Sequence, residues 1–168
     1  MATIELTQGQ VTVVDDADLP LLIGYRWIAQ KRVNAGVVTY YAAASVKTDR
    51  GWRLLLLHRL LMGEPKGIII DHRNGNSLDN RRENLRPCSN GQNRANSKKH
   101  KVGLSKYKGV TLDRGKVTAQ IRHEGRLRNL GKFETEEAAA RAYDREARRL
   151  HGEFARTNFP EETNGQSA

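Results

Sequence analysis

The polar stretch DHRNGNSLDNRRENLRPCSNGQN, from Asp71 to Asn93, most constrains how this chain can fold. It carries Asn, Asp and Arg where a core would need apolar side chains. The run GIIID before it predicts a buried strand that ends at Asp71 and His72, and Asn74-Gly75 then predicts a turn. The stretch is therefore either a plain surface loop or a site for a metal ion and a phosphate.

Composition favours a polyanion as partner. The chain has 168 residues, a formal net charge of +10 and a pI near 10.0, which points to nucleic acid before membrane. No apolar run is long enough to span a bilayer, and ATIELTQGQ after Met1 does not resemble a secretory signal, so we expect an intracellular (cytoplasmic) protein. Cys88 is the only cysteine, so we expect no structural zinc.

The first half predicts strands and one short helix. We expect a β-rich platform over residues 1–53, with turns at Gln8-Gly9 and around Gly36. GWRLLLLHRLLMGEP predicts a strand that passes into a short helix from His58. NLRPC predicts another strand, and Ser89 is a candidate N-cap for a helix that ends near residue 96. The aromatic residues expected in the core are Trp27, Tyr40, Tyr41 and Trp52.

The second half predicts a sheet and a helix. Residues 98–104 are expected to be a basic linker, residues 105–160 a separate domain and residues 161–168 a flexible tail. The strand GKVTAQIRHEG alternates apolar and polar side chains, and two more strands flank it. Thr135 is the expected N-cap of an amphipathic helix that ends at Gly152. The fold class is therefore α+β, with a three-stranded antiparallel sheet packed on one helix.

Asp71, His72 and Asn93 could act together. Carboxylate and amide oxygens are ligands for Mg²⁺ or Mn²⁺, and an imidazole can take a proton from water. Adjacent strand residues point to opposite faces, so Asp71 and His72 converge only if the pleat relaxes. The alternative is that the Asp-His pair only begins a hydrogen-bonded turn.

The segments LHRLLMG, IIIDHRNGNSLDNRRENLR and SNGQNRAN resemble the HNH endonucleases of the subgroup found in homing enzymes of phages and mobile elements. The resemblance implies a ββα-metal nuclease motif over residues 54–97 that hydrolyses DNA to 5′-phosphate and 3′-hydroxyl ends. It implies Asp71 and Asn93 as ligands of one Mg²⁺ or Mn²⁺ ion and His72 as the general base. Asn84 would brace the loop, and His58 would have a supporting role.

The segments YKGV, GKVTAQIR, LGKFETEEAAARAYDREA and GEFARTNFP resemble the DNA-binding domain of plant APETALA-type, ethylene-responsive transcription factors. The resemblance implies that the polar face of the sheet binds double-stranded DNA. Thr111, Asp113 and Asn129 depart from the family pattern, so its base preference does not carry over. The expected DNA-contacting residues are Lys108, Arg114, Lys116, Gln120, Arg122, Arg126 and Arg128.

These patterns favour a homing-type nicking endonuclease that a sheet domain localises on DNA. The main alternative is a non-catalytic DNA-binding protein or regulator with a degenerate nuclease domain, and a third is an RNA-binding or structural basic protein. A monomer with one active site would nick, whereas cutting both strands would need a dimer or two visits.

Overall fold

A computed structural model describes residues 1–34, 36–98 and 104–160. It divides the chain into two compact units, Met1–Ser89 and Asn90–Ala168. Most of the expected linker and the whole expected tail lie outside the described residues. Within the described ranges, no helix has the length and apolar character needed to cross a membrane.

The first unit begins with a small hairpin. β1 (Ala2–Glu5) pairs antiparallel with β2 (Val11–Val14) around the short 3-10 turn η1 (Thr7–Gly9). Gln8 and Gly9 have φ values of 62° and 65°, which closes the turn that the sequence predicts. The 3-10 turn η2 (Asp16–Asp18) and the four-residue helix α1 (Leu19–Leu22) follow.

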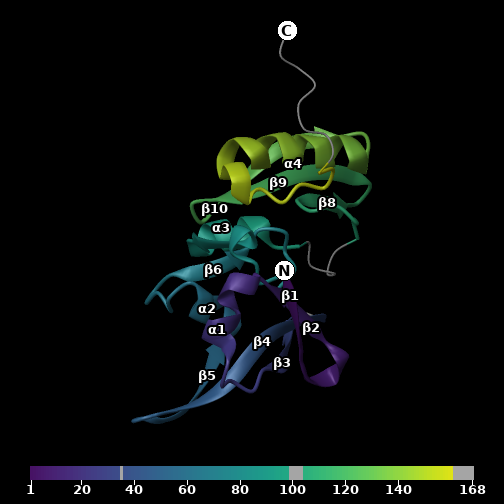
Figure 1. Ribbon diagram of the computed structural model, residues 1–168. Coiled ribbons are helices and arrows are strands. Elements are labelled where there is room, and N and C mark those ends of the chain that lie inside the picture. The colour runs from purple at the N-terminus through teal and green to yellow at the C-terminus, as the bar shows by residue number, and fades with distance from the viewer. Residues whose placement is uncertain (35, 99–103, 161–168) are drawn as a thin grey trace. The chain divides into compact units, whose positions relative to one another are not determined.

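A three-stranded antiparallel sheet forms the body of this unit (Figure 1). Its strands are β3 (Ile28–Asn34), β4 (Val37–Thr48) and β5 (Gly51–Leu56), with β4 in the centre, and β5 runs directly into α2 (Leu57–Leu61). Ala29, Ala42, Ala44 and Leu55 lie on one face of the sheet and join the core with Trp27.

The expectation that Trp52 is buried was wrong, because its side chain is 73% exposed. Trp52 pairs with Lys47 on the opposite face from Leu55, and this is the face that carries Tyr41. Tyr41 is only partly buried and packs against histidine rings instead of the apolar core.

A second hairpin carries the polar stretch. β6 (Ile69–His72) pairs antiparallel with β7 (Leu85–Cys88), and the 3-10 turn η3 (Arg82–Asn84) leads into β7. The register places Asp71 opposite Arg86 and His72 opposite Leu85, so pairing continues to the end of β6. β1–β2, the β3–β5 sheet and this hairpin all belong to the first unit.

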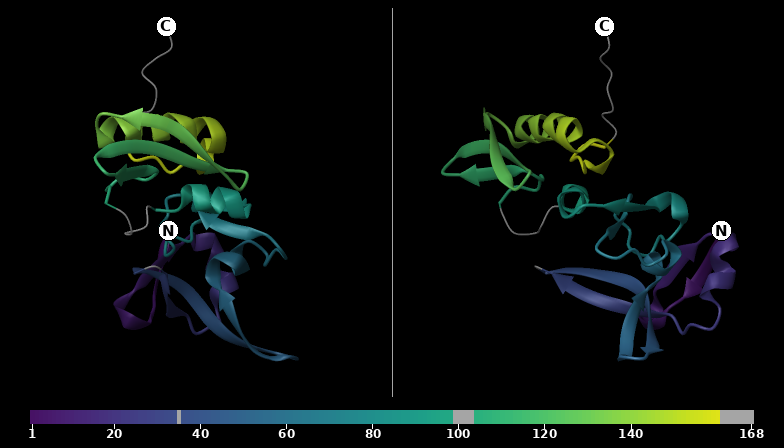
Figure 2. Two further views of the ribbon diagram at one scale, coloured as in Figure 1. Left: turned by 180° about the vertical axis from the view of Figure 1, so that it is seen from behind. Right: turned by 90° about the vertical axis from the view of Figure 1, so that its left-hand side faces the viewer.

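The second unit begins with the helix α3 (Asn90–Asn96). Its sheet contains β8 (Val110–Asp113), β9 (Lys116–His123) and β10 (Arg126–Phe133), in the order β10-β9-β8. The helix α4 (Glu136–His151) lies along one face of this sheet (Figure 2), and the 3-10 turn η4 (Gly152–Phe154) follows.

Sequence and structure agree on the α+β class and on the start of α4. The Thr135 side chain accepts a hydrogen bond from the Ala138 backbone N–H at 3.1 Å, as expected of an N-cap. Gly152 follows the last residue of α4 with a φ of 52°. Small side chains, among them Ala139, Ala140 and Ala147, allow α4 to approach β9 closely.

Candidate functional site

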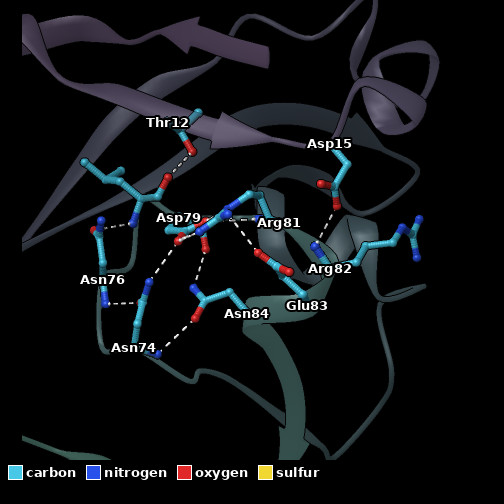
Figure 3. A network of polar contacts seen from close by, with 10 residues as sticks. Thr12, Asp15, Asn74, Asn76, Asp79, Arg81, Arg82, Glu83 and Asn84 are labelled. Atoms are coloured by element: carbon cyan, nitrogen blue, oxygen red, sulfur yellow. Dashed lines mark hydrogen bonds and ion pairs between the residues drawn. The ribbon is translucent and has the colours of Figure 1, made fainter. Parts of the chain in front are cut away.

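Asn84 ties together the two ends of the loop between β6 and β7 (Figure 3). Its Oδ1 accepts a hydrogen bond from the Asn74 backbone N–H at 2.9 Å, and its Nδ2 donates to the Asp79 carbonyl at 2.6 Å. Its own carbonyl accepts from the Arg73 backbone N–H at 2.8 Å. A buried amide therefore fixes the path of the loop just after His72.

Asp79 is the polar centre of the same loop. Its carboxylate accepts from Asn74 Nδ2 at 2.8 Å and from Arg81 Nε and Nη2 at 2.8 and 2.7 Å (Figure 3). Hydrogen bonding from Arg81 holds the pKa of Asp79 below its ordinary value. The abundance of Asn and Asp in this segment is explained by these bonds, which close the loop without an apolar core.

The N-terminal hairpin and the residues that follow it form hydrogen bonds with the loop in two places. Val13 of β2 donates its backbone N–H to the Leu78 carbonyl at 2.9 Å and accepts from the Asn80 N–H at 2.8 Å. Farther along, the Arg82 backbone N–H donates to Asp15 Oδ2 at 2.9 Å, and its guanidinium pairs with the buried Asp18 at 2.7 Å. The region before residue 20 is thus part of the scaffold of this loop.

His72 lies buried at the end of β6 among other rings. Its ring centroid is 5.0 Å from that of His58, in an edge-on arrangement, and 6.5 Å from that of Tyr41. Nε2 of His72 is 3.1 Å from Oδ1 of Asn80. Burial lowers the pKa of His72 below its ordinary value and lowers the pKa of His58 to about 3. Both imidazoles are therefore neutral near pH 7, and a neutral imidazole can accept a proton.

Asp71 has a different neighbour. Arg86 donates from Nε and Nη2 to Asp71 Oδ2 at 3.1 and 3.0 Å, and both side chains are buried. Regular pairing to the end of β6 keeps Asp71 and His72 on opposite faces of the strand, so the pleat does not relax between them.

Asn93 lies exposed on α3, in the second unit, and its association with Asp71 stays a prediction. In the ranges that the structure describes, no three His, Cys, Asp or Glu side chains gather as a group that could hold a metal ion. The expected site instead combines one carboxylate with one amide, both of which are oxygen donors that suit Mg²⁺ or Mn²⁺.

The sheet of the second unit has an outer face, opposite α4. Lys116, Thr118, Gln120 and Arg122 of β9 lie on it, since Val117, Ala119 and Ile121 alternate with them toward the core. Lys132 is not among the expected DNA-contacting residues, but its pairing with Thr118 places it on the same face. Gln120 Nε2 donates to Thr111 Oγ1 at 2.6 Å across this face, and Arg114 lies in the turn before Gly115 with a φ of 47°.

Three expected DNA-contacting residues lie elsewhere. Arg128 is opposite the buried Ile121 and Arg126 is opposite His123, so both are on the side of β10 that faces α4. Lys108 is largely buried, and its Nζ donates to the Ala95 carbonyl and, at 2.8 Å, to the Ser97 carbonyl. The buried position of Lys108 could not be predicted, because a lysine before a strand has the same sequence pattern whether its side chain is solvated or buried.

Comparison with known proteins identifies the family. Residues 57–95 match the family model described as HNH endonuclease. Protein 3.8 of Escherichia phage T7 is 39% identical over 98 residues, which are 55% of this chain and 77% of the phage protein. The chain belongs to the HNH endonuclease family. It is a DNA endonuclease, and the resemblance of residues 54–96 to this family is confirmed.

Two other relatives extend the comparison. An uncharacterized HNH endonuclease of Acanthamoeba polyphaga mimivirus is 29% identical over 140 residues, covering 83% of this HNH endonuclease and 70% of the relative. An ethylene-responsive transcription factor of Arabidopsis thaliana is 57% identical over 47 residues, which are 27% of this chain and 18% of the plant protein. No solved structure matches the chain.

Proposed function

We propose that this HNH endonuclease is a metal-dependent, homing-type nicking enzyme that leaves 5′-phosphate and 3′-hydroxyl ends. The observation that carries the proposal is that the buried His72 and the buried Asp71 follow each other at the end of β6, at the start of a loop that Asn84 braces. Pairing with β7 and the hydrogen bonds of Asn84 fix the end of β6, which keeps Asp71 and His72 in a constant relative position, as in-line attack requires.

Each residue has a separate role in the proposed reaction. His72 takes the proton from the attacking water, because its imidazole is neutral at working pH. Asp71 and Asn93 would hold one Mg²⁺ or Mn²⁺ ion through a carboxylate and an amide oxygen. When bound, the ion supplies positive charge for the phosphate and the leaving 3′ oxygen. Because Asp71 and His72 are on opposite faces of β6, the scissile phosphate would lie across the end of that strand.

Supercoiled plasmid provides the test. We expect open circles when the full chain is supplied with Mg²⁺ or Mn²⁺, none with EDTA, and a 10²- to 10⁴-fold slower reaction for His72→Ala. His151→Gln is the matched control, because His151 is on α4 and has no part in the proposed chemistry. Near-full activity of His72→Ala would reject His72 as the base. Linear plasmid as the first product would contradict the nicking monomer and would indicate that both strands are cut, either by a dimer or by two successive binding events of one monomer.

The sheet of the second unit is proposed to bind the DNA backbone as an APETALA-type domain. Support comes from the three basic residues on its outer face, Lys116, Arg122 and Lys132, and from the similarity to the plant transcription factor. With about five phosphates contacted, log K should fall against log salt with a slope of roughly −4 to −5.

Removing charges from each side of the sheet in turn tests whether DNA binds to the outer face or is only attracted by the overall positive charge of the protein. Lys116→Gln and Lys132→Gln should each reduce the salt slope by about 1. Arg126→Gln and Arg128→Gln remove the same charge on the side of β10 that faces α4 and serve as controls. Equal effects on both sides would reject the outer face as the binding surface.

The rival function is a non-catalytic DNA-binding protein or regulator with a degenerate nuclease domain. This rival would be favoured if the protein binds DNA that carries its true site but does not cleave that DNA when Mg²⁺ or Mn²⁺ is present. Both functions imply that the protein acts inside the cell, where DNA is found, so its location does not distinguish them.

A further inference from the structure

Thr12, Asn80 and His72 form one chain of hydrogen bonds that begins in the N-terminal hairpin. The Thr12 hydroxyl donates to the Leu78 carbonyl at 2.8 Å and accepts from Asn80 Nδ2 at 2.7 Å. Asn80 Oδ1 then lies 3.1 Å from His72 Nε2. Thr12 and Asn80 are both 0% exposed and His72 is 6% exposed, so water does not compete for these bonds.

The direction of every bond in the chain follows from its first member. The Leu78 carbonyl can only accept, so the single proton of the Thr12 hydroxyl points to it. The hydroxyl oxygen must then accept from Asn80, and only the amide nitrogen can donate. The amide oxygen of Asn80 consequently faces His72, and the nitrogen that meets it must carry a hydrogen.

We propose that Thr12 and Asn80 are positioning residues that hold His72 as the Nε2–H tautomer, so that Nδ1 is the nitrogen that accepts the proton. In a neutral imidazole only one nitrogen carries hydrogen, and fixing that hydrogen on Nε2 makes Nδ1 the basic atom. The inference rests on the proposed role of His72 as general base. It connects Thr12 of β2 to the proposed general base, although Thr12 precedes His72 by 60 residues.

The backbone supports this role for the hairpin. Val13 and Asp79 form a parallel bridge next to Thr12 and Asn80, through the two bonds of Val13 to Leu78 and Asn80. The bridge sets the distance between Thr12 and the amide of Asn80, independently of their side chains. A hydroxyl at residue 12 is then the feature that distinguishes the two ends of that amide.

The first measurement is the tautomer of His72 in the full chain. Imidazole ¹⁵N shifts of the wild type at neutral pH distinguish Nε2–H from Nδ1–H, and His72→Gln identifies the signals of His72 among the five histidines. We expect hydrogen on Nε2. Hydrogen on Nδ1 overturns the proposal, whatever the variants do.

The second measurement uses three threonine variants and the nicking reaction. Thr12→Val keeps the shape but removes the hydroxyl, Thr12→Ser keeps the hydroxyl, and Thr3→Val is the control on the exposed face of the same hairpin. Thr12→Val should lower the single-turnover rate roughly 10- to 100-fold, the usual effect of losing an outer-shell partner. DNA affinity should not change, and the His72 shifts should move toward the other tautomer. Thr12→Ser and Thr3→Val should resemble the wild type.

The outcomes separate this inference from the proposed function. If the wild type nicks and His72→Ala does not, but folded Thr12→Val nicks at the wild-type rate, the positioning role is rejected and the nuclease stands. If His72→Ala nicks normally, the proposed general base fails and the catalytic part of the inference fails with it. A Thr12→Val protein with a slower rate but unchanged His72 shifts would mean a structural role alone, which also rejects the proposal.

Discussion

Arg86 donates two hydrogen bonds to a single oxygen of Asp71, from Nε at 3.1 Å and from Nη2 at 3.0 Å. The two residues are directly opposite each other in the β6–β7 pair. Their side chains are 6% and 8% exposed, so the pair is withdrawn from water. The guanidinium that faces this buried carboxylate across the strands offsets part of the cost of withdrawing both groups from water.

Removing the arginine should therefore destabilise the first unit. We expect Arg86→Met to lower the free energy of unfolding by about 3–5 kcal/mol, because a buried carboxylate would remain without its cation. Urea unfolding followed by circular dichroism measures the change. Arg53→Met breaks the exposed Arg53–Glu64 pair and should have a much smaller effect.

The double variant Asp71→Asn/Arg86→Met decides whether the pair is the cause. Removing both charges should leave a more stable protein than Arg86→Met alone. If the two losses simply add, the contact between Asp71 and Arg86 does not account for the stability of this hairpin.

The strands and helices around the site were predictable because their signals are local. The β-branched run ending at His72, the Asn74-Gly75 turn and the Thr135 cap each depend on a few neighbouring residues. The sequence also predicts Asn84 as a residue that braces the loop, and its side chain forms hydrogen bonds with Asn74 and Asp79 of that loop.

The contacts that tune the site were not predictable in this way. Asn80 reaches Thr12 across 68 residues of sequence, and nothing near either residue indicates the other. Arg86 lies opposite Asp71 only in one strand register, which a loop of unknown path does not fix. The face on which Arg128 lies was unpredictable for the same reason, since a shift of one residue in register moves a side chain to the other face of the sheet. Arg128 pairs with Ile121 and so lies on the side that faces α4.

Gly109 should tolerate no side chain. Its φ is 76°, and a Cβ there would lie 2.0 Å from Cδ2 of Tyr143. The Tyr143 ring is 5% exposed and packs with Ile121 and Ala147, so it has no room to move away. We expect Gly109→Ala to destabilise the second unit by roughly 2–5 kcal/mol, from backbone strain together with overpacking.

Gly115 supplies a control with the same backbone. Its φ is also 76°, but nothing lies within 4 Å of an added Cβ. Gly115→Ala should therefore show only the conformational cost, about 1–2 kcal/mol. Thermal unfolding of the two variants side by side measures the difference, and equal losses would show that the Tyr143 ring yields.

Lys108 should make the stability of the second unit depend on pH. Burial lowers the pKa of Lys108 to about 8, from an ordinary value of 10.5, while its Nζ donates to the carbonyls of Ala95 and Ser97. A lowered lysine pKa means that the folded state holds the proton less tightly than the unfolded state. The protonated Lys108 therefore lowers the free energy of unfolding below pH 8, and this loss disappears as the pH rises from about 8 to 10.5.

Lys108→Met isolates this contribution from other groups that titrate at high pH. Between pH 7 and pH 10 the wild type should gain up to about 3 kcal/mol relative to Lys108→Met in urea unfolding, given 1.4 kcal/mol per pKa unit. Lys106→Met removes the exposed neighbouring lysine, whose pKa is raised, and should not show this gain. A pH-independent difference between wild type and Lys108→Met would mean that Lys108 keeps its ordinary pKa, and hence that water reaches Nζ at the end of α3.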